Sequence, residues 1–475
     1  MKKKLLAIVI LVLAICLAGC QTEKTSDDSS RNKKTEEKKD KNSKKEKNDK
    51  EKEKEDRETN EGTLAEEIFL FEELENGTIR ITGITDTSVT EVVIPHQIKG
   101  VDVTEVTDQA FVGCVDLQKV DFANVITIDD GAFQDCKKLT TVVGEKVKNV
   151  WNRAFMGCDS LSNIDFPELQ SVGYYAFANC SALTELPFSK LEYIGETAFF
   201  GCVGLTEIEL EEVTEISVSA FEECANLAKV SFPKATIVRS SAFENCRLLE
   251  EVNMPSVTEL GDDVFYACDL LLEIDMPNLT IMGGSVFSGC SNLTRVSMPK
   301  VEGIGGYTFA SCIKLAETDF SSVTFVGMYT FKGCESLKEI HMPKLTTIGE
   351  TAFAYCTGLT RVELESVEKI GVASFWECTA LESAKFPKAT VIADRAFRAC
   401  TELTSIEIPN VTSIGDAFSG CNNLTSVVLP GDIESDQLTP FAYTRGLQEV
   451  HTPSGSATEQ WAKKMGYVVI NTNEE

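Results

Sequence analysis

The stretch Phe111-Val-Gly-Cys114-Val-Asp-Leu117 introduces the pattern Phe-x-x-Cys-x-x-Leu, which decides the fold of this chain. The pattern occurs fifteen times, and no copy loses its Phe, its Cys or its Leu. The spacing from Cys114 to Cys136 is repeated at every step as far as Cys400, and only the last step, to Cys421, is shorter, by a single position. A fixed period of this size is typical of a solenoid, in which each unit contacts only its neighbours. We therefore expect function on the outer surface of a long stack.

The unit from Phe331 to Ala352 shows what each repeat should form. Ile340 and Met342 alternate with polar residues, which is the period of a strand with one buried face, and a proline ends that strand. A second short extended piece leads to Gly349, which suits a turn with positive φ. Residues 350–353 are then predicted to form a single helical or 3₁₀ turn.

Some units depart from the pattern at positions that should be buried. Thr318 and Ala384 replace the aliphatic residue of the strand, and Gly144 replaces the next buried residue, so we expect weak rungs there. Residues 441–447 read as a sixteenth unit, in which Thr444 stands where the cysteine would be.

The unit Leu403-Thr-Ser-Ile-Glu-Ile-Pro409, followed by Val411-Thr-Ser-Ile-Gly415 and Ala417-Phe-Ser-Gly-Cys421, resembles the leucine-rich repeat of BspA-like bacterial surface proteins. Segments 92–104 and 453–462 resemble the ends of that family's solenoid. The resemblance implies a curved, right-handed leucine-rich-repeat solenoid of α/β type, rich in β-structure, with about 16 units and a cap at each end. It also implies adhesion or protein binding at the bacterial surface.

The N-terminal region differs in composition from the repeats. Residues 1–19 have three lysines and then an apolar run, as a secretory signal does. Leu17-Ala-Gly-Cys20 resembles the lipobox of bacterial lipoproteins, which implies a lipid on Cys20 and a folded part that is exported and held at the cell envelope. The alternative is an ordinary cleaved signal with an incidental cysteine.

The following segment, 20–62, is predicted to be a disordered charged tether. Residues 21–60 contain 14 basic and 13 acidic side chains, and such a segment has too little apolar area to fold. A single long helix is the alternative. Beyond the tether we expect a β-rich N-terminal cap over 63–109, the solenoid over 110–450, and a C-terminal cap and tail over 451–475.

The charge of the chain restricts its partners. The net charge is −29, and the part after residue 60 carries 28 basic against 61 acidic residues, a net charge of −33. Such a surface repels nucleic acid and favours solubility or a basic partner. Nucleic-acid binding is therefore not expected.

The repeat cysteines could pair as disulfides, because adjacent rungs are about 4.8 Å apart. Fifteen equivalent sites cannot all pair, and each lies between a Phe and a Leu, so we favour a row of buried free thiols. Metal ligands must converge on one point, which a straight row does not do, and no metal site is expected.

Catalytic chemistry is not indicated either. The three histidines, His96, His341 and His451, are far apart in the sequence and lie near no nucleophile motif. Phosphate-binding and calcium-binding loops are absent from the sequence. We expect no enzyme, no catalytic residue and no cofactor.

Two surface patterns could carry binding. The residues five and seven after each cysteine should point outward from the first strand, and many are acidic. The predicted strip comprises Glu185, Glu207, Glu209, Glu251, Glu273, Asp275, Glu317, Asp319, Glu339 and Glu363. It would dock a basic protein segment, or would only keep the protein soluble. Aromatic residues beside the repeat Phe, such as Tyr307, Tyr329 and Trp376, could anchor partners or sugars; we favour packing between adjacent turns.

These observations leave two functions open. The first is a lipid-anchored surface protein that binds a protein partner, either host matrix or another cell, with carbohydrate as an unsupported possibility. The second is a structural spacer that associates with itself or with the envelope and has no external ligand.

Overall fold

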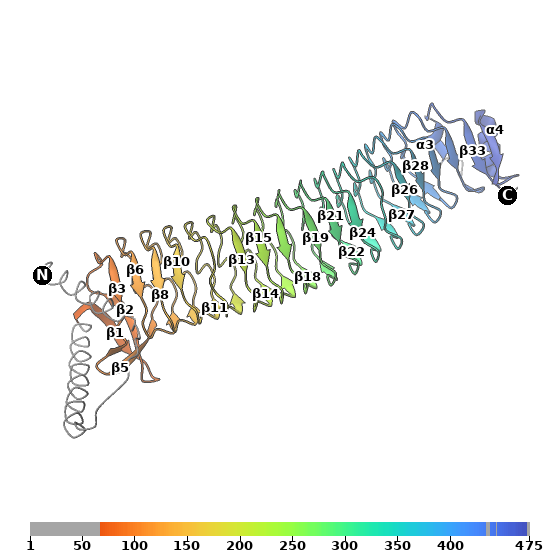
Figure 1. The fold of residues 1–475 in the computed structure, drawn as a ribbon. Helices are drawn as coiled ribbons and strands as arrows, with labels where there is room; N and C mark the ends of the chain where they lie inside the picture. The colour runs from red at the N-terminus through yellow and green to blue at the C-terminus, as the bar shows by residue number, and fades with distance from the viewer. Residues whose placement is uncertain (1–66, 434–437, 443, 473–475) are drawn as a thin grey trace, which may run out of the picture.

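The computed structural model describes residues 67–433, 438–442 and 444–472. The predicted signal peptide, Cys20 and the tether lie outside these residues. The described chain forms a long, gently bending stack, with the N-terminal cap and the C-terminal helix at opposite ends (Figure 1). It is a parallel β-solenoid of about 18 turns, so the predicted leucine-rich-repeat stack is confirmed. The turns outnumber the sixteen sequence units because strands of both end segments continue the stack.

The N-terminal end combines antiparallel and parallel pairing. Strand β1 (Phe69–Glu73) is antiparallel to β2 (Ile79–Ile84), and β2 is parallel to β5 (Val101–Val106), which also pairs with the short β4 (Gln97–Ile98). Strand β3 (Glu91–Val93) lies parallel to the first strand of the first repeat. Both rows of strands in the solenoid therefore begin in this segment.

Most repeats contribute one three-residue strand and one two-residue strand, and most of these strands pair in parallel with their counterparts in the next unit. The three-residue strands are β6 (Lys119–Asp121), β8 (Thr141–Val143), β10 (Asn163–Asp165), β13 (Glu207–Glu209), β15 (Lys229–Ser231), β17 (Glu251–Asn253), β19 (Glu273–Asp275), β21 (Arg295–Ser297), β23 (Glu317–Asp319), β26 (Arg361–Glu363), β28 (Ser383–Lys385), β30 (Ser405–Glu407) and β32 (Ser426–Val428).

The two-residue strands form the second row. They are β7 (Thr127–Ile128), β9 (Asn149–Val150), β11 (Ser171–Val172), β12 (Tyr193–Ile194), β14 (Glu215–Ile216), β16 (Ile237–Val238), β18 (Glu259–Leu260), β20 (Ile281–Met282), β22 (Gly303–Ile304), β24 (Phe325–Val326), β25 (Thr347–Ile348), β27 (Lys369–Ile370), β29 (Val391–Ile392) and β31 (Ser413–Ile414).

The predicted weak rungs nevertheless form strands. Thr318 lies in β23 and Ala384 in β28. At Gly144 a side chain would meet Val147 at 2.5 Å and phenylalanines of the two neighbouring rungs at 3.2 and 3.3 Å, so the neighbours already fill the space. The first row is instead interrupted at 185–187, where Pro187 has no N–H to donate, and at 339–341, and it also divides between β17 and β19.

The core is organised by a stack of phenylalanine rings. The repeat Phe of each unit is buried, and its ring lies nearly parallel to the ring of the next unit, with centroids 4.6–5.6 Å apart. The stack runs from Phe111 to Phe441, through the sixteenth unit. Each interior ring therefore packs on two others, which is why a single unit could not bury its own apolar face.

The corner before each cysteine is built differently from the predicted helical turn. The residue preceding the cysteine has a positive φ of 56–88° in all fifteen copies. The residue five before the cysteine has a positive φ of 52–62° in every copy except the last. That last unit is shorter than the others by a single position, and the missing residue belongs to this corner. Left-handed residues thus turn the chain where a helical turn was predicted, and that prediction was wrong.

Backbone hydrogen bonds join these corners from rung to rung. Phe331 donates to the carbonyl of Ala352 at 2.7 Å, and Gly333 donates to Ala354 at 2.9 Å. Gly349 is needed for close approach and not for positive φ, which corrects the sequence prediction: a side chain there would come within 2.5 Å of the Gly327 backbone.

At the C-terminal end the described chain forms two helices and two longer strands. Helix α3 (Thr439–Ala442) leads into β33 (Glu449–Thr452), helix α4 (Ala457–Met465) and β34 (Val468–Asn471). Ser456 accepts a hydrogen bond from the Glu459 N–H and caps α4. Trp461 packs against the core and Ala462 is fully buried, so α4 covers its end. Within the described residues, no helix has the length and apolar character to cross a membrane.

Candidate binding surface

The first row of strands presents the predicted acidic strip to solvent. In β13, Ile208 is buried while Glu207 and Glu209 on either side are exposed, because side chains alternate across a strand. All ten acidic residues predicted for the strip are exposed. Parallel pairing in register places equivalent positions of neighbouring rungs side by side, as in β19 and β21.

Part of the strip is neutralised by neighbouring cations. Lys229 lies 3.2 Å from Glu251, and Arg295 lies 3.4 Å from Glu273 and 3.9 Å from Glu317. Lys385 lies 3.5 Å from Glu363, which is also 2.7 Å from Arg361. These four strip carboxylates therefore belong to exposed ion pairs, each of which contributes about 0–1 kcal/mol to stability.

The remaining six strip residues form no ion pair within the described part of the chain. They are Glu185, Glu207, Glu209, Asp275, Asp319 and Glu339. Three of them, together with exposed Asp165 at the end of β10, lie on three successive rungs. We call Asp165, Glu185, Glu207 and Glu209 the acidic patch.

The acidic patch surrounds the first interruption of the row. Strands β10 and β13 belong to different sheets because residues 185–187 of the rung between them form no strand. The cause is visible in the sequence, since Pro187 stands where neighbouring rungs have Asp165 and Glu209. The sequence predictions missed this interruption, although the proline could have revealed it.

Lysines on the loop after the first strand are engaged elsewhere. Lys190 lies 2.6 Å from Glu168, and Lys234 lies 2.6 Å from Glu212. The hydrogen bond from Lys190 lowers the pKa of Glu168 below its ordinary value, although this carboxylate is solvent-exposed. These cations pair with acids of their own row of loops, so they leave the acidic patch unneutralised.

The repeat cysteines are buried free thiols, as predicted. From Cys136 to Cys421, each Sγ donates to the carbonyl of the preceding unit's Phe at 3.0–3.6 Å. Burial raises the pKa of Cys136, Cys202 and Cys356 to about 12. A thiolate is the reactive and metal-binding form, so burial disfavours the reactive form of these thiols in the folded chain.

The aromatic residues of the corners pack on one another and on cations. Tyr307 stacks on Tyr329 with centroids 4.8 Å apart, and Tyr355 lies against Trp376. Lys332 covers Tyr329 and Tyr355, at 5.4 and 5.8 Å from the ring centres. Packing between adjacent turns therefore accounts for this group, in agreement with the favoured interpretation.

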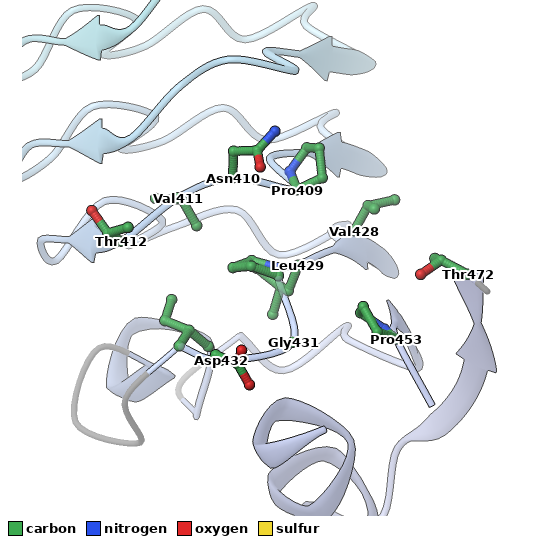
Figure 2. A pocket seen from close by; sticks show the side chains of 12 residues that line it. Pro409, Asn410, Val411, Thr412, Val428, Leu429, Gly431, Asp432, Pro453 and Thr472 are labelled. Atoms are coloured by element: carbon green, nitrogen blue, oxygen red, sulfur yellow. The ribbon is translucent and has the colours of Figure 1, made fainter. Parts of the chain in front are cut away.

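The described residues do not bring the three histidines together. The three histidines lie in the N-terminal cap, mid-stack and in β33, and no set of three metal-ligating side chains converges in the described chain. A cavity of about 640 Å³ lies at the C-terminal end, between the loops after β30 and β32 and the cap (Figure 2). Asp432 is its only titratable lining residue, so the cavity offers no acid–base pair.

Comparison with known proteins identifies the repeats. The family model described as "BspA type Leucine rich repeat region (6 copies)" matches residues 84–206, 214–338, 258–382, 302–416 and 346–460. The chain belongs to the BspA-type leucine-rich-repeat family. Its repeat family and fold are typically non-enzymatic, and the leucine-rich-repeat fold is generally a scaffold for protein interaction.

Solved structures of other bacterial leucine-rich repeat proteins are similar to this chain. A leucine-rich repeat protein from Bacteroides ovatus ATCC 8483 is 27% identical, with a TM-score of 0.61, over 81% of this chain and 98% of its own. A leucine rich cell surface protein from Faecalibacterium prausnitzii A2-165 is 20% identical, with a TM-score of 0.36, over 83% of this chain and 95% of its own. No curated protein matches the sequence significantly.

Proposed function

We propose that this BspA-type chain is a bacterial cell-surface protein that binds a protein partner through a basic segment lying on the acidic patch. The observation that carries the proposal is the pairing of charges along the strip. Four strip carboxylates have cationic neighbours, whereas those of the acidic patch have no ion pair within the described chain. An exposed, unpaired group of one sign attracts an opposite charge and speeds its association.

The position of the acidic patch also suits an extended segment. Its carboxylates lie on three successive rungs, and rungs are about 4.8 Å apart, so it spans about 10 Å along the stack. Lysines or arginines of a peptide that follows the stack could reach two or three carboxylates at once. Several weak pairs would then act together, as a single exposed pair cannot.

Surface location belongs to the same proposal. The similar Faecalibacterium prausnitzii protein is described as a cell surface protein. The lipobox-like Leu17-Ala-Gly-Cys20 and the charged segment 20–62 would anchor the stack and hold it away from the membrane. We propose the lipid on Cys20 as the membrane anchor and the charged segment as the tether. The proposed partner is a protein with a basic segment.

A pair of matched triple variants tests the role of the patch. The first is Glu185→Gln/Glu207→Gln/Glu209→Gln, and the control is Glu273→Gln/Glu317→Gln/Glu363→Gln, which removes the same charge from paired positions. A Lys- and Arg-rich peptide, or a basic partner recovered by pull-down from host-matrix and neighbouring-cell proteins, serves as the ligand. We expect about tenfold weaker binding for the first variant and at most about threefold for the control, from pair energies of about 0.2–1 kcal/mol.

Two results would count against the proposal. Equal losses in the two variants would mean that only net charge matters. Unchanged binding in both would mean that the partner lies elsewhere on the stack.

A further inference from the structure

The last described strand of the solenoid has an edge with which no other described strand pairs. Among the described residues, β34 is the last strand of its six-stranded sheet and pairs with β33 alone. Its sequence, Val468-Val-Ile-Asn471, contains no charge and no proline. Natural edge strands are usually protected by lysines, prolines or bulges, because an unprotected edge pairs with other strands.

The opposite end of the molecule has such protection. There the outermost strand, β1, is antiparallel, with a register irregularity between Leu70 and Phe71. It also ends in Glu72 and Glu73. The first strand of the other row, β3, starts with Glu91. Only the C-terminal edge therefore combines regular pairing with an uncharged sequence.

The backbone geometry of β34 shows which N–H and C=O groups can pair with another strand. Val468 donates its N–H to the Gln448 carbonyl at 2.8 Å, toward the interior of the sheet. Because these directions alternate along a strand, the N–H and C=O of Val469 point to the free edge. The side chains of Val468 and Ile470 point outward and are 59% and 39% exposed.

We propose that two copies of this chain associate tail to tail by antiparallel pairing of their β34 strands. With a two-fold axis at Val469, the two copies of this residue lie opposite each other and form a hydrogen-bonded pair. The N–H of each Val469 then donates to the carbonyl of the other. Paired residues of antiparallel strands lie on the same face, so Val468 of each copy opposes Ile470 of the other. The four exposed apolar side chains thus meet, which stabilises the pair.

A second copy fits this edge better than other occupants do. The strand is self-complementary in this register, because its hydrogen-bonding residue and its two apolar residues are symmetric about Val469. Lateral association through the strip would oppose carboxylates of like charge. Pairing with β3 of another copy would place Glu91 against an uncharged strand.

The dimer is independent of the proposed partner site. The acidic patch lies in the N-terminal half of the stack, far from β34 along its length (Figure 1). A tail-to-tail dimer would therefore present two patches, and its N-terminal ends would point away from each other. A variant that loses dimerisation could therefore still be tested for partner binding, and a variant that loses partner binding could still be tested for dimerisation.

The test is sedimentation of the full chain over a range of concentrations. We expect a concentration-dependent dimer that Val468→Lys/Ile470→Lys abolishes and that Val93→Lys leaves intact. Val93 is the matched control, because it is 49% exposed on β3 at the other end. A monomer at every concentration, a dimer that persists in the double variant, or growth to larger head-to-tail species would overturn the proposal.

A cross-linking measurement keeps the test valid if the lysine variant folds poorly. Under mild oxidation, a mixture of Val468→Cys and Ile470→Cys chains should form an interchain disulfide between these two positions. Either variant alone should form much less, because neither position opposes itself. Equal cross-linking in all three samples would contradict the proposed register.

Discussion

The corner and the outward strand positions of the same rung follow opposite rules. At the corner, fifteen of the sixteen units repeat the same Phe and Cys, and both residues are buried. Five residues after the cysteine, successive units carry Lys119, Thr141, Asn163, Glu185 and Glu207. The corner must match its neighbours because it packs on them, whereas the outward positions meet water. Stability therefore resides in the constant residues, and recognition can vary without disturbing it.

The largest effect should come from ionising the corner thiols from Cys114 to Cys400 together. Burial raises the pKa of Cys136, Cys202 and Cys356 from the ordinary value to about 12. The unfolded chain loses its thiol protons first, so stability is complete below about pH 9 and falls between about pH 9 and 12. Each such thiol should cost about 1.4 kcal/mol per pH unit in this window. Denaturant unfolding at a series of pH values measures this slope.

The variant Cys246→Ala isolates the thiol contribution from that of tyrosines and lysines. Above about pH 9, the free energy of unfolding of this variant should fall less steeply with pH than that of the unsubstituted chain. The difference should equal the contribution of one thiol, since Cys246 is buried and its pKa is raised. An identical slope in the two chains would show that the thiols are not the groups that destabilise the stack.

Truncating one ring of the stack should be the next largest effect. Phe243 is fully buried, with stacked neighbours 5.5 and 5.6 Å away, so Phe243→Ala should lower the free energy of unfolding by about 3–5 kcal/mol. Phe325 is the matched control, because it is 46% exposed on β24. Urea unfolding compares Phe243→Ala with Phe325→Ala. A similar loss of unfolding free energy in both variants would show that corner and surface positions do not differ in their contribution to stability.

A glycine pair tests the close approach of adjacent turns. A methyl group at Gly349 would meet the backbone of Gly327, so Gly349→Ala should destabilise the chain by about 1–3 kcal/mol. At Gly303 no atom lies within 4 Å of the added carbon, and Gly303→Ala should be neutral or stabilising by up to about 1 kcal/mol. Thermal unfolding would contradict this account if the two variants changed in the same direction.

The smallest effect is expected for an exposed ion pair of the strip. Lys229→Ala removes the cation beside Glu251, and both side chains are about half exposed or more. The loss should stay below about 1 kcal/mol and should shrink further in high salt. A loss as large as that of Phe243→Ala would mean that the strip also holds the stack together.

Much of the architecture could be predicted because the same pattern of buried and polar positions recurs in most units of the repeat. The buried positions, the two strands of each unit and the free thiols all follow from the period and the type of residue. The corner was mispredicted because Ala352-Phe353 reads locally as helix, whereas hydrogen bonds to the adjacent rung impose left-handed residues. The sequence predicts a weak rung at Gly144, but it does not show that phenylalanines of the neighbouring rungs occupy the space beside this glycine.

The binding surface was less predictable. The exposure of its carboxylates followed from strand alternation, but their pairing did not. Whether Glu251 meets Lys229 depends on side chains one rung apart, and Lys190 could have approached the strip but binds Glu168. The free edge of β34 depends on where the stack ends, which the period alone does not fix.

Residue-resolved thiol labelling measures whether the corners of neighbouring rungs form one continuous buried core. The native chain is treated with a thiol reagent near neutral pH, and the modified cysteines are located by mass spectrometry, with and without denaturant. The buried corners predict that Cys136 to Cys400 stay unmodified in the native chain and become modified together on unfolding. Rapid native labelling of interior cysteines, or their recovery as disulfides, would contradict a continuous dry core shared by neighbouring rungs.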